Sequence, residues 1–111
     1  MIADWMQQHR HLEALLEELA AAPDPLPLFP VVKRHLLHHY EAEDATMPAK
    51  IRRQHDDVRE IMQAIEEGGD VTSMVRQLVA LASHNIIEEE RDWFPFLTPA
   101  SDAAAGESQK Q

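Results

Sequence analysis

The chain has no cysteine and little glycine or aromatic character, with three glycines, one tyrosine and three phenylalanines among 111 residues. Without cysteine there can be no disulfide, thiolate ligand or iron–sulfur cluster, so any metal must be held by imidazole and carboxylate groups. No apolar run approaches the roughly 18 residues of a membrane-spanning helix, and the N-terminus turns polar too early for a signal peptide. We therefore expect a cytoplasmic protein with no membrane partner.

Positive charge is also scarce. Ten lysines and arginines stand against twenty acidic residues, which gives a net charge of −10. Such a surface repels phosphates, so nucleic acid and anionic membranes are disfavoured as partners. The abundant residue is histidine, of which there are seven. The composition indicates one acidic helical domain that is rich in imidazole.

Apolar residues recur at helical spacing and predict four helices. The expected ranges are 4–22, 30–46, 48–67 and 70–93. Asp4 and Asp70 are suitable N-caps, and Pro30 and Pro48 suit a first helical turn. Gly68-Gly69 is expected to stop the third helix. Because no alternating β pattern occurs, the predicted fold class is all-α.

Short links between the second and third helices, and between the third and fourth, predict an up-down antiparallel four-helix bundle. The segment 23–30, PDPLPLFP, cannot be helical because four prolines remove backbone donors. We expect the helical domain to occupy residues 1–97. Residues 98–111 are small and polar, and we expect this C-terminal tail to be disordered.

Each predicted helix carries one histidine at a similar height: His9, His39, His55 and His84. The height follows from the distance to the turns, at about 1.5 Å per residue. His39 lies eight residues before Met47, and His55 lies eight residues after it. His39 and His55 also share rows with apolar residues and should point inward, whereas His84 falls at the edge of its apolar arc.

Two of these histidines are followed four residues later by glutamate, Glu43 after His39 and Glu88 after His84. That spacing is one helical turn, so imidazole and carboxylate can reach the same cluster. The predicted metal ligands are His9, His39, Glu43, His55, His84 and Glu88. Imidazole with carboxylate suits iron, manganese or zinc. Six ligands exceed the need of one tetrahedral zinc and fit two ions bridged by the carboxylates.

Other readings of these residues stay open. A single inward histidine is more often a hydrogen-bonded core residue, and a run of glutamates is usually a solvated face. Glu89 competes with Glu88 because it lies nearer the middle of the apolar arc, whereas Glu90 is expected to be solvent-exposed. The remaining histidines, His11, His35 and His38, are not expected to join the set, although His35 is a candidate spare ligand.

The chain resembles the hemerythrin-like family of HHE cation-binding domains over about residues 5–97. The segments that carry the resemblance are HRHLEALLEEL, HYEAEDATMP, RRQHDDVREIM and HNIIEEERDWFP. Their order, H…HxxxE…H…HxxxE, is far more specific than any one segment. The resemblance implies a non-haem di-iron centre in which Glu43, a fourth-helix glutamate and an oxo or hydroxo group bridge two iron ions.

The chain also departs from the oxygen-carrying members. These have HxxxH in the third helix, but here Ile51 lies four residues before His55. They also place the fourth-helix carboxylate five residues after the histidine, at the position of Glu89. The missing histidine leaves more open positions on the metals and disfavours a pure oxygen carrier. The resemblance then implies a small protein that binds or senses dioxygen or a related ligand, or handles iron, and signals through a separate protein partner.

Two other functions are compatible with the sequence. A di-metal oxidase or peroxidase would use the open coordination positions, but no acid–base residue outside the ligand set is evident. A metal-independent interaction module would use the acidic surface and the apolar PLPLF link. Metal analysis separates this module from the two metal-binding functions.

Overall fold

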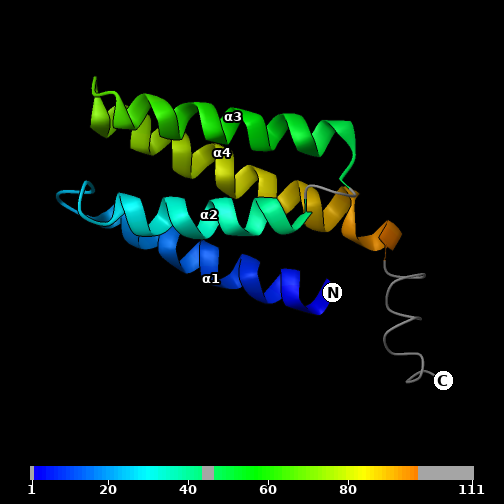
Figure 1. The fold of residues 1–111 in the computed structure, drawn as a ribbon. Coiled ribbons are helices and arrows are strands. Elements are labelled where there is room, and N and C mark those ends of the chain that lie inside the picture. Colours follow the sequence, from blue (N-terminus) through cyan, green and yellow to red (C-terminus); the bar gives the residue numbers. More distant parts are fainter. Residues whose placement is uncertain (1, 44–46, 98–111) are drawn as a thin grey trace.

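The computed structural model describes residues 2–43 and 47–97 of the protein. This part of the chain is all-helical and contains no strand. Its helices are α1 (Ile2–Ala21), α2 (Phe29–Glu43), α3 (Ala49–Glu66) and α4 (Val71–Asp92). Figure 1 shows the four helices side by side. The predicted all-α fold class is confirmed.

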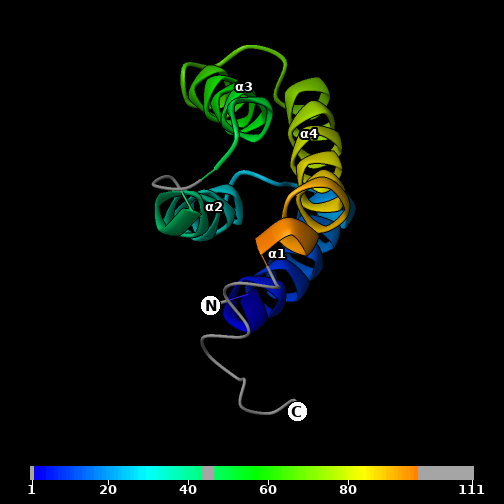
Figure 2. The same ribbon diagram turned by 90° about the vertical axis from the view of Figure 1, so that its right-hand side faces the viewer.

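Helix α4 connects α3 to the pair formed by α1 and α2. It packs against α3 and also against α1, and α1 packs in turn against α2. The view in Figure 2 shows α3 and α4 above α2 and α1. Each helix therefore has an inner side that faces its neighbours and can bury apolar residues there.

The predicted helix starts were partly correct. Asp70 is the N-cap of α4, since its Oδ1 accepts a hydrogen bond from the backbone N–H of Ser73 at 3.2 Å. Helix α1 begins at Ile2, so Asp4 lies in its first turn and the prediction of an Asp4 cap was wrong. A carboxylate in a first turn still interacts favourably with the positive end of the helix dipole.

Glycine ends α3 as predicted. Gly68 and Gly69 have φ angles of +98° and +102°, in the region that L side chains rarely adopt. At Gly69 an added Cβ would also lie 2.6 Å from the Cε of Met74. The turn between α3 and α4 therefore depends on glycine for both conformation and space.

The proline-rich segment between α1 and α2 is non-helical from residue 22 to residue 28. The prediction that residues 23–30 are non-helical was correct except at its end, because α2 begins at Phe29 and Pro30 lies in its first turn. Two other predictions lie outside the described residues. These are the end of the second helix near Thr46 and the disordered tail at residues 98–111.

Two apolar clusters form the core. The large cluster includes Leu12, Leu16, Leu36, Val58 and Ile86 among its buried residues. The small cluster consists of Ile2, Trp5, Met47, Ile51, Trp93 and Phe94, with Met6 and Leu97 packed against it. All four helices contribute to the large cluster, which joins them into one body.

The outer faces of the helices are polar. Exposed ion pairs connect neighbouring helices, including Lys33 with Glu66 and Lys50 with Asp92. Such surface pairs typically contribute less than about 1 kcal/mol each, so the apolar core dominates stability. None of the helices in the described residues combines the length and apolar character needed to cross a bilayer.

Replacing Leu16 by alanine should destabilise the fold, because its side chain is only 1% exposed within the large cluster. Loss of buried methyl groups and the resulting cavity predict a decrease of roughly 2–5 kcal/mol in the free energy of unfolding. Urea denaturation measures this change. Leu26→Ala is the matched control, since Leu26 is 50% exposed and its truncation should change stability by less than about 0.5 kcal/mol. Similar effects of both substitutions would contradict this description of the core.

Candidate metal centre

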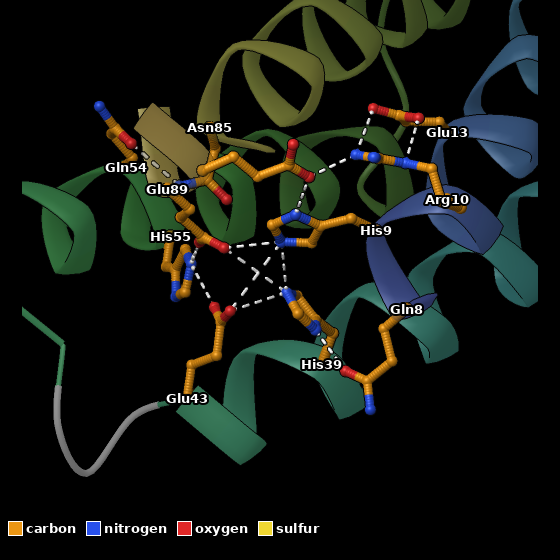
Figure 3. Close-up of polar contacts among 11 residues, drawn as sticks. Gln8, His9, Arg10, Glu13, His39, Glu43, Gln54, His55, Asn85 and Glu89 are labelled. Carbon is orange, nitrogen blue, oxygen red and sulfur yellow. Dashed lines mark hydrogen bonds and ion pairs between the residues drawn. The ribbon is translucent and has the colours of Figure 1, made fainter. Parts of the chain in front are cut away.

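Five buried polar side chains from all four helices converge at one level of the structure (Figure 3). They are His9 of α1, His39 and Glu43 of α2, His55 of α3 and Glu89 of α4. We refer to these five residues as the His/Glu cluster. Each of them is at most 1% exposed, which is unusual for histidine and glutamate.

The helices place this cluster between the two apolar clusters. On α1, His9 lies between Trp5 of the small cluster and Leu12 of the large one. On α3, His55 lies between Ile51 and Val58 in the same way. These spacings of three or four residues keep the polar residue on the inward face of its helix. The sequence therefore buries one polar layer inside an otherwise apolar core.

Each carboxylate presents its two oxygens to different histidines. Glu89 Oε1 lies 2.8 Å from His9 Nε2, and its Oε2 lies 2.6 Å from His55 Nε2. Glu43 Oε2 lies 3.0 Å from His39 Nε2, and its Oε1 lies 3.3 Å from His55 Nε2. Glu43 and Glu89 therefore both span the distance between the His9–His39 pair and His55.

The outer nitrogens of two imidazoles are held by hydrogen-bond acceptors. His9 Nδ1–H donates to Glu90 Oε2 at 2.7 Å, and His39 Nδ1–H donates to Gln8 Oε1 at 2.5 Å. In neutral imidazoles this places the lone pairs on Nε2, and the two Nε2 atoms lie 3.0 Å apart. A ligating histidine is commonly oriented by this kind of outer hydrogen bond.

The cluster has an excess of acceptors that a cation would satisfy. Each buried oxygen of Glu43 lies within ion-pair distance of a histidine Nε2, but neither makes a hydrogen bond of good geometry among the described residues. A buried carboxylate that lacks such hydrogen bonds is costly. Four residues each offer one ligand atom, and these four atoms lie within 4.8 Å of one another: His9, His39, Glu43 and Glu89. Nitrogen and oxygen donors at such spacing are able to bind a divalent transition metal. The residues present thus fit a metal ion.

The electrostatics of the His/Glu cluster favour positive charge among its imidazole nitrogens and carboxylate oxygens. Burial opposes the charged form of His39, but the contacts and charges of Glu43 and Glu89 outweigh it and raise the pKa of His39 to about 9. The same causes raise the pKa of His55. Burial would raise the pKa of Glu89, yet its contacts with the histidines hold that pKa well below its ordinary value. In the absence of metal, protons on His39 and His55 offset the negative charge of Glu89.

Aromatic rings cover two of the imidazoles. The Phe94 ring stacks on His9 with centroids 5.1 Å apart, and the Tyr40 ring stacks on His55 at 3.8 Å. Burial, with the nearby charges of Glu89 and Glu43, raises the pKa of Tyr40 well above its ordinary value, so the phenol stays neutral. These rings restrict rotation of the imidazoles and exclude water from them.

Two of the six predicted ligands lie outside the cluster. The His84 side chain is 62% exposed, and its Nε2 lies 3.3 Å from Glu88 Oε2. Glu88 in turn contacts Lys50 Nζ at 2.6 Å and Arg91 at 2.7 Å, and the contact with Lys50 is the main cause that lowers the pKa of Glu88. The structure therefore does not bring His84 and Glu88 into the cluster, although Glu88 is itself buried, at 6% exposed. The structure brings together the other four, His9, His39, Glu43 and His55.

Glu89 faces the interior because of its position on α4. The buried residues Ala82, Asn85, Glu89 and Trp93 recur at spacings of three and four. Glu88 is also buried, but it is turned about 100° away from Glu89 and contacts Lys50 and Arg91 instead. Asn85 takes the inward position next to His84, and its Nδ2 donates to Gln54 Oε1 at 2.9 Å. The buried row was readable from the sequence, but the repeated HxxxE pattern favoured Glu88.

The structure also corrects the expectation that Glu90 is solvent-exposed. Its side chain is 24% exposed and accepts hydrogen bonds from His9 and Arg10. Gln8, which orients His39, was not singled out from the sequence at all. Gln8 directly precedes the cluster residue His9, and Glu90 directly follows the cluster residue Glu89. No periodicity signal identifies them, because their role depends on which helix faces them.

Comparison of the chain with models of protein families, with characterised proteins and with solved structures finds no match. The His/Glu cluster is therefore the feature of the chain that bears on its function.

The raised pKa of His39 predicts that the metal-free protein loses stability as pH increases. Because the pKa of His39 is higher in the folded state, its protonation stabilises the fold fully at pH values below its unfolded pKa of about 6.5. This stabilisation is lost as pH rises through the folded pKa of about 9. The loss should be on the order of 1–3 kcal/mol. The lowered pKa of Glu89 does not offset it, because that carboxylate is ionised in both states throughout this range.

Urea unfolding at about pH 6 and about pH 9.5, with a chelator present, measures this loss. His39→Gln should reduce the difference in the free energy of unfolding between the two pH values, although His55 retains a smaller contribution of the same sign. His84→Ala should leave it unchanged, because His84 lies outside the cluster. Equal stability at both pH values in the unsubstituted protein would show that the imidazoles are not charged in the folded metal-free state.

Proposed function

We propose that the protein is a small hemerythrin-like, non-haem di-iron protein that binds or senses dioxygen or a related small ligand, or handles iron. The observation that carries this proposal is the arrangement of Glu43 and Glu89. Each of these carboxylates presents one oxygen to the His9–His39 side of the cluster and the other to His55. Carboxylates in this position are suited to bridge two metal ions inside a helical bundle.

The donor set divides into two unequal groups. His9 and His39, with Glu43 Oε2 and Glu89 Oε1, would hold one ion. His55, with the two remaining oxygens, would hold the second. The second ion would have one protein imidazole and correspondingly more positions for water or a small ligand. Iron suits this mixture of imidazole and carboxylate, which contains no thiolate.

Two iron ions in this cluster would supply reversible one-electron chemistry and open positions for a small ligand. The chain itself would hold the ligand tautomers through Glu90 and Gln8, which accept from the outer nitrogens of His9 and His39. Stacked Phe94 and Tyr40 would exclude water from the imidazoles. This division of roles favours binding or sensing of a small ligand over catalysis on a larger substrate.

We also propose that the chain is a hemerythrin-like domain whose four helices form an up-down antiparallel bundle. Two observations support this: the turn between α3 and α4 is short, and buried side chains from all four helices meet at one level. We further propose that the protein is cytoplasmic and that the output of sensing passes through a separate protein partner.

The iron content of the purified protein tests the proposal. We expect about two iron ions per chain from iron-replete cells, because the cluster supplies two groups of nitrogen and oxygen donors. Glu89→Gln should reduce this content by at least about half, since it removes a charged donor between His9 and His55. Elemental analysis measures the metal. A reproducible single zinc without iron would contradict the di-iron assignment.

Glu88→Gln is the matched control, because it changes the adjacent glutamate in the same way. Glu88 pairs with Lys50 and Arg91, so its replacement should leave iron content within error. His39→Ala and His84→Ala form a second matched pair, with loss of metal expected only for His39→Ala. Equal losses of iron from Glu88→Gln and Glu89→Gln would show that iron binding does not depend on which of the two glutamates lies in the cluster.

The behaviour in air separates ligand binding from oxidation. The reduced, iron-loaded protein should change its visible absorption when exposed to air, because the second group of donors leaves positions open. Recovery of the original spectrum after removal of oxygen would indicate reversible binding. A spectrum that recovers only on addition of a reductant would indicate oxidation of iron and favour redox sensing. Absence of any change would contradict a role in oxygen chemistry.

A further inference from the structure

A pocket of about 440 Å³ lies between α1 and α2, outside the His/Glu cluster. Its lining includes three histidines that the cluster does not use, His11 of α1 with His35 and His38 of α2, together with Asp4. Gln8 and the cluster residue His39 also line it. Six of the seven histidines therefore lie in the cluster or in this pocket, since His9 and His55 are the other cluster members.

The imidazoles of this pocket come from two facing helices. The rings of His11 and His35 lie edge to face with centroids 4.9 Å apart. His38 follows His35 by three residues, about one helical turn, so it projects near the same side of α2. His11 and His38 are exposed and His35 is half-buried. Exposed side chains can change rotamer, so two of these imidazoles can turn toward a shared ion.

The chemistry of the pocket favours a cation of intermediate softness. Neutral imidazoles provide nitrogen lone pairs that suit zinc, copper or nickel, and Asp4 adds a carboxylate. The net charge of −10 raises the local concentration of cations and repels anionic ligands. A hard cation such as magnesium prefers oxygen donors and would gain little from three histidines.

We propose that this pocket is a second, solvent-facing site for a divalent transition-metal ion, with His11 and His35 as ligands and His38 and Asp4 at its rim. The site is formed by side chains at the surface of α1 and α2 and does not require a metal in the His/Glu cluster. The pocket borders that cluster, because the cluster residue His39 lines it and donates its Nδ1–H to Gln8, which also lines it. An ion held here therefore lies next to the outer side of a cluster histidine.

Zinc titration of the full-length protein as purified tests this site. The number of zinc ions bound per chain, by equilibrium dialysis, is compared between the unsubstituted protein and the His11→Ala/His35→Ala double variant. We expect about one zinc ion fewer per chain in the variant. The difference between the two proteins measures the pocket alone, whether or not the cluster already contains iron or takes up zinc. Failure of the di-iron proposal would instead appear as a lack of iron in both proteins.

His84→Ala is the matched control, because it removes an exposed imidazole that lies on α4 and not in the pocket. It should bind the same number of zinc ions as the unsubstituted protein. Equal zinc binding by the double variant and the unsubstituted protein would overturn the proposal. An equal loss from His84→Ala would also overturn it, since any surface histidine would then suffice.

A measurement on the unsubstituted protein covers the case in which the double variant fails to fold. Substoichiometric nickel should broaden the imidazole proton signals of His11 and His35 in the NMR spectrum before those of His84. Broadening of His84 first, or of all exposed histidines together, would overturn the proposal.

Discussion

The structure depends on the burial of two carboxylates among three imidazoles in an apolar core. Glu43 and Glu89 are fully buried, and neither can remain ionised there without positive charge beside it. The imidazoles of His39 and His55 supply that charge when protonated, and a metal ion held by the cluster would supply it as well. This requirement ties all four helices to a common level.

The apolar core and the polar layer reinforce one another. The large and small apolar clusters lie on either side of the layer. On α1 and α3 a single buried polar residue, His9 or His55, separates residues of the two clusters, whereas α2 and α4 each bury more than one polar residue. Truncating an apolar neighbour would therefore change the position of a cluster residue as well as the buried area. Conversely, stacking of Phe94 and Tyr40 on two imidazoles uses apolar surface to orient polar groups. Stability and site geometry are consequently set by the same contacts.

The surface histidines extend this arrangement toward solvent. Gln8 contacts His39 on one side and lines the pocket of His11 and His35 on the other. The cluster is thus not isolated from the α1–α2 surface, because a single side chain belongs to both. On the α4 side the connection is of a different kind. Glu90 accepts from His9 and also from Arg10, so an exposed ion pair orients a buried imidazole.

The sequence by itself determined the helices and most of the site, because periodicity, proline, glycine and caps act locally. His9, His39, Glu43 and His55 were predictable, since each lies in an apolar row of its own helix. Only the tertiary structure decided between Glu88 and Glu89, because adjacent residues differ by about 100° around a helix. Packing of α4 against α1 and α3 sets that rotation and places His84 in solvent. The partners Gln8 and Glu90 were likewise decided by contacts between helices, which no pattern within one helix records.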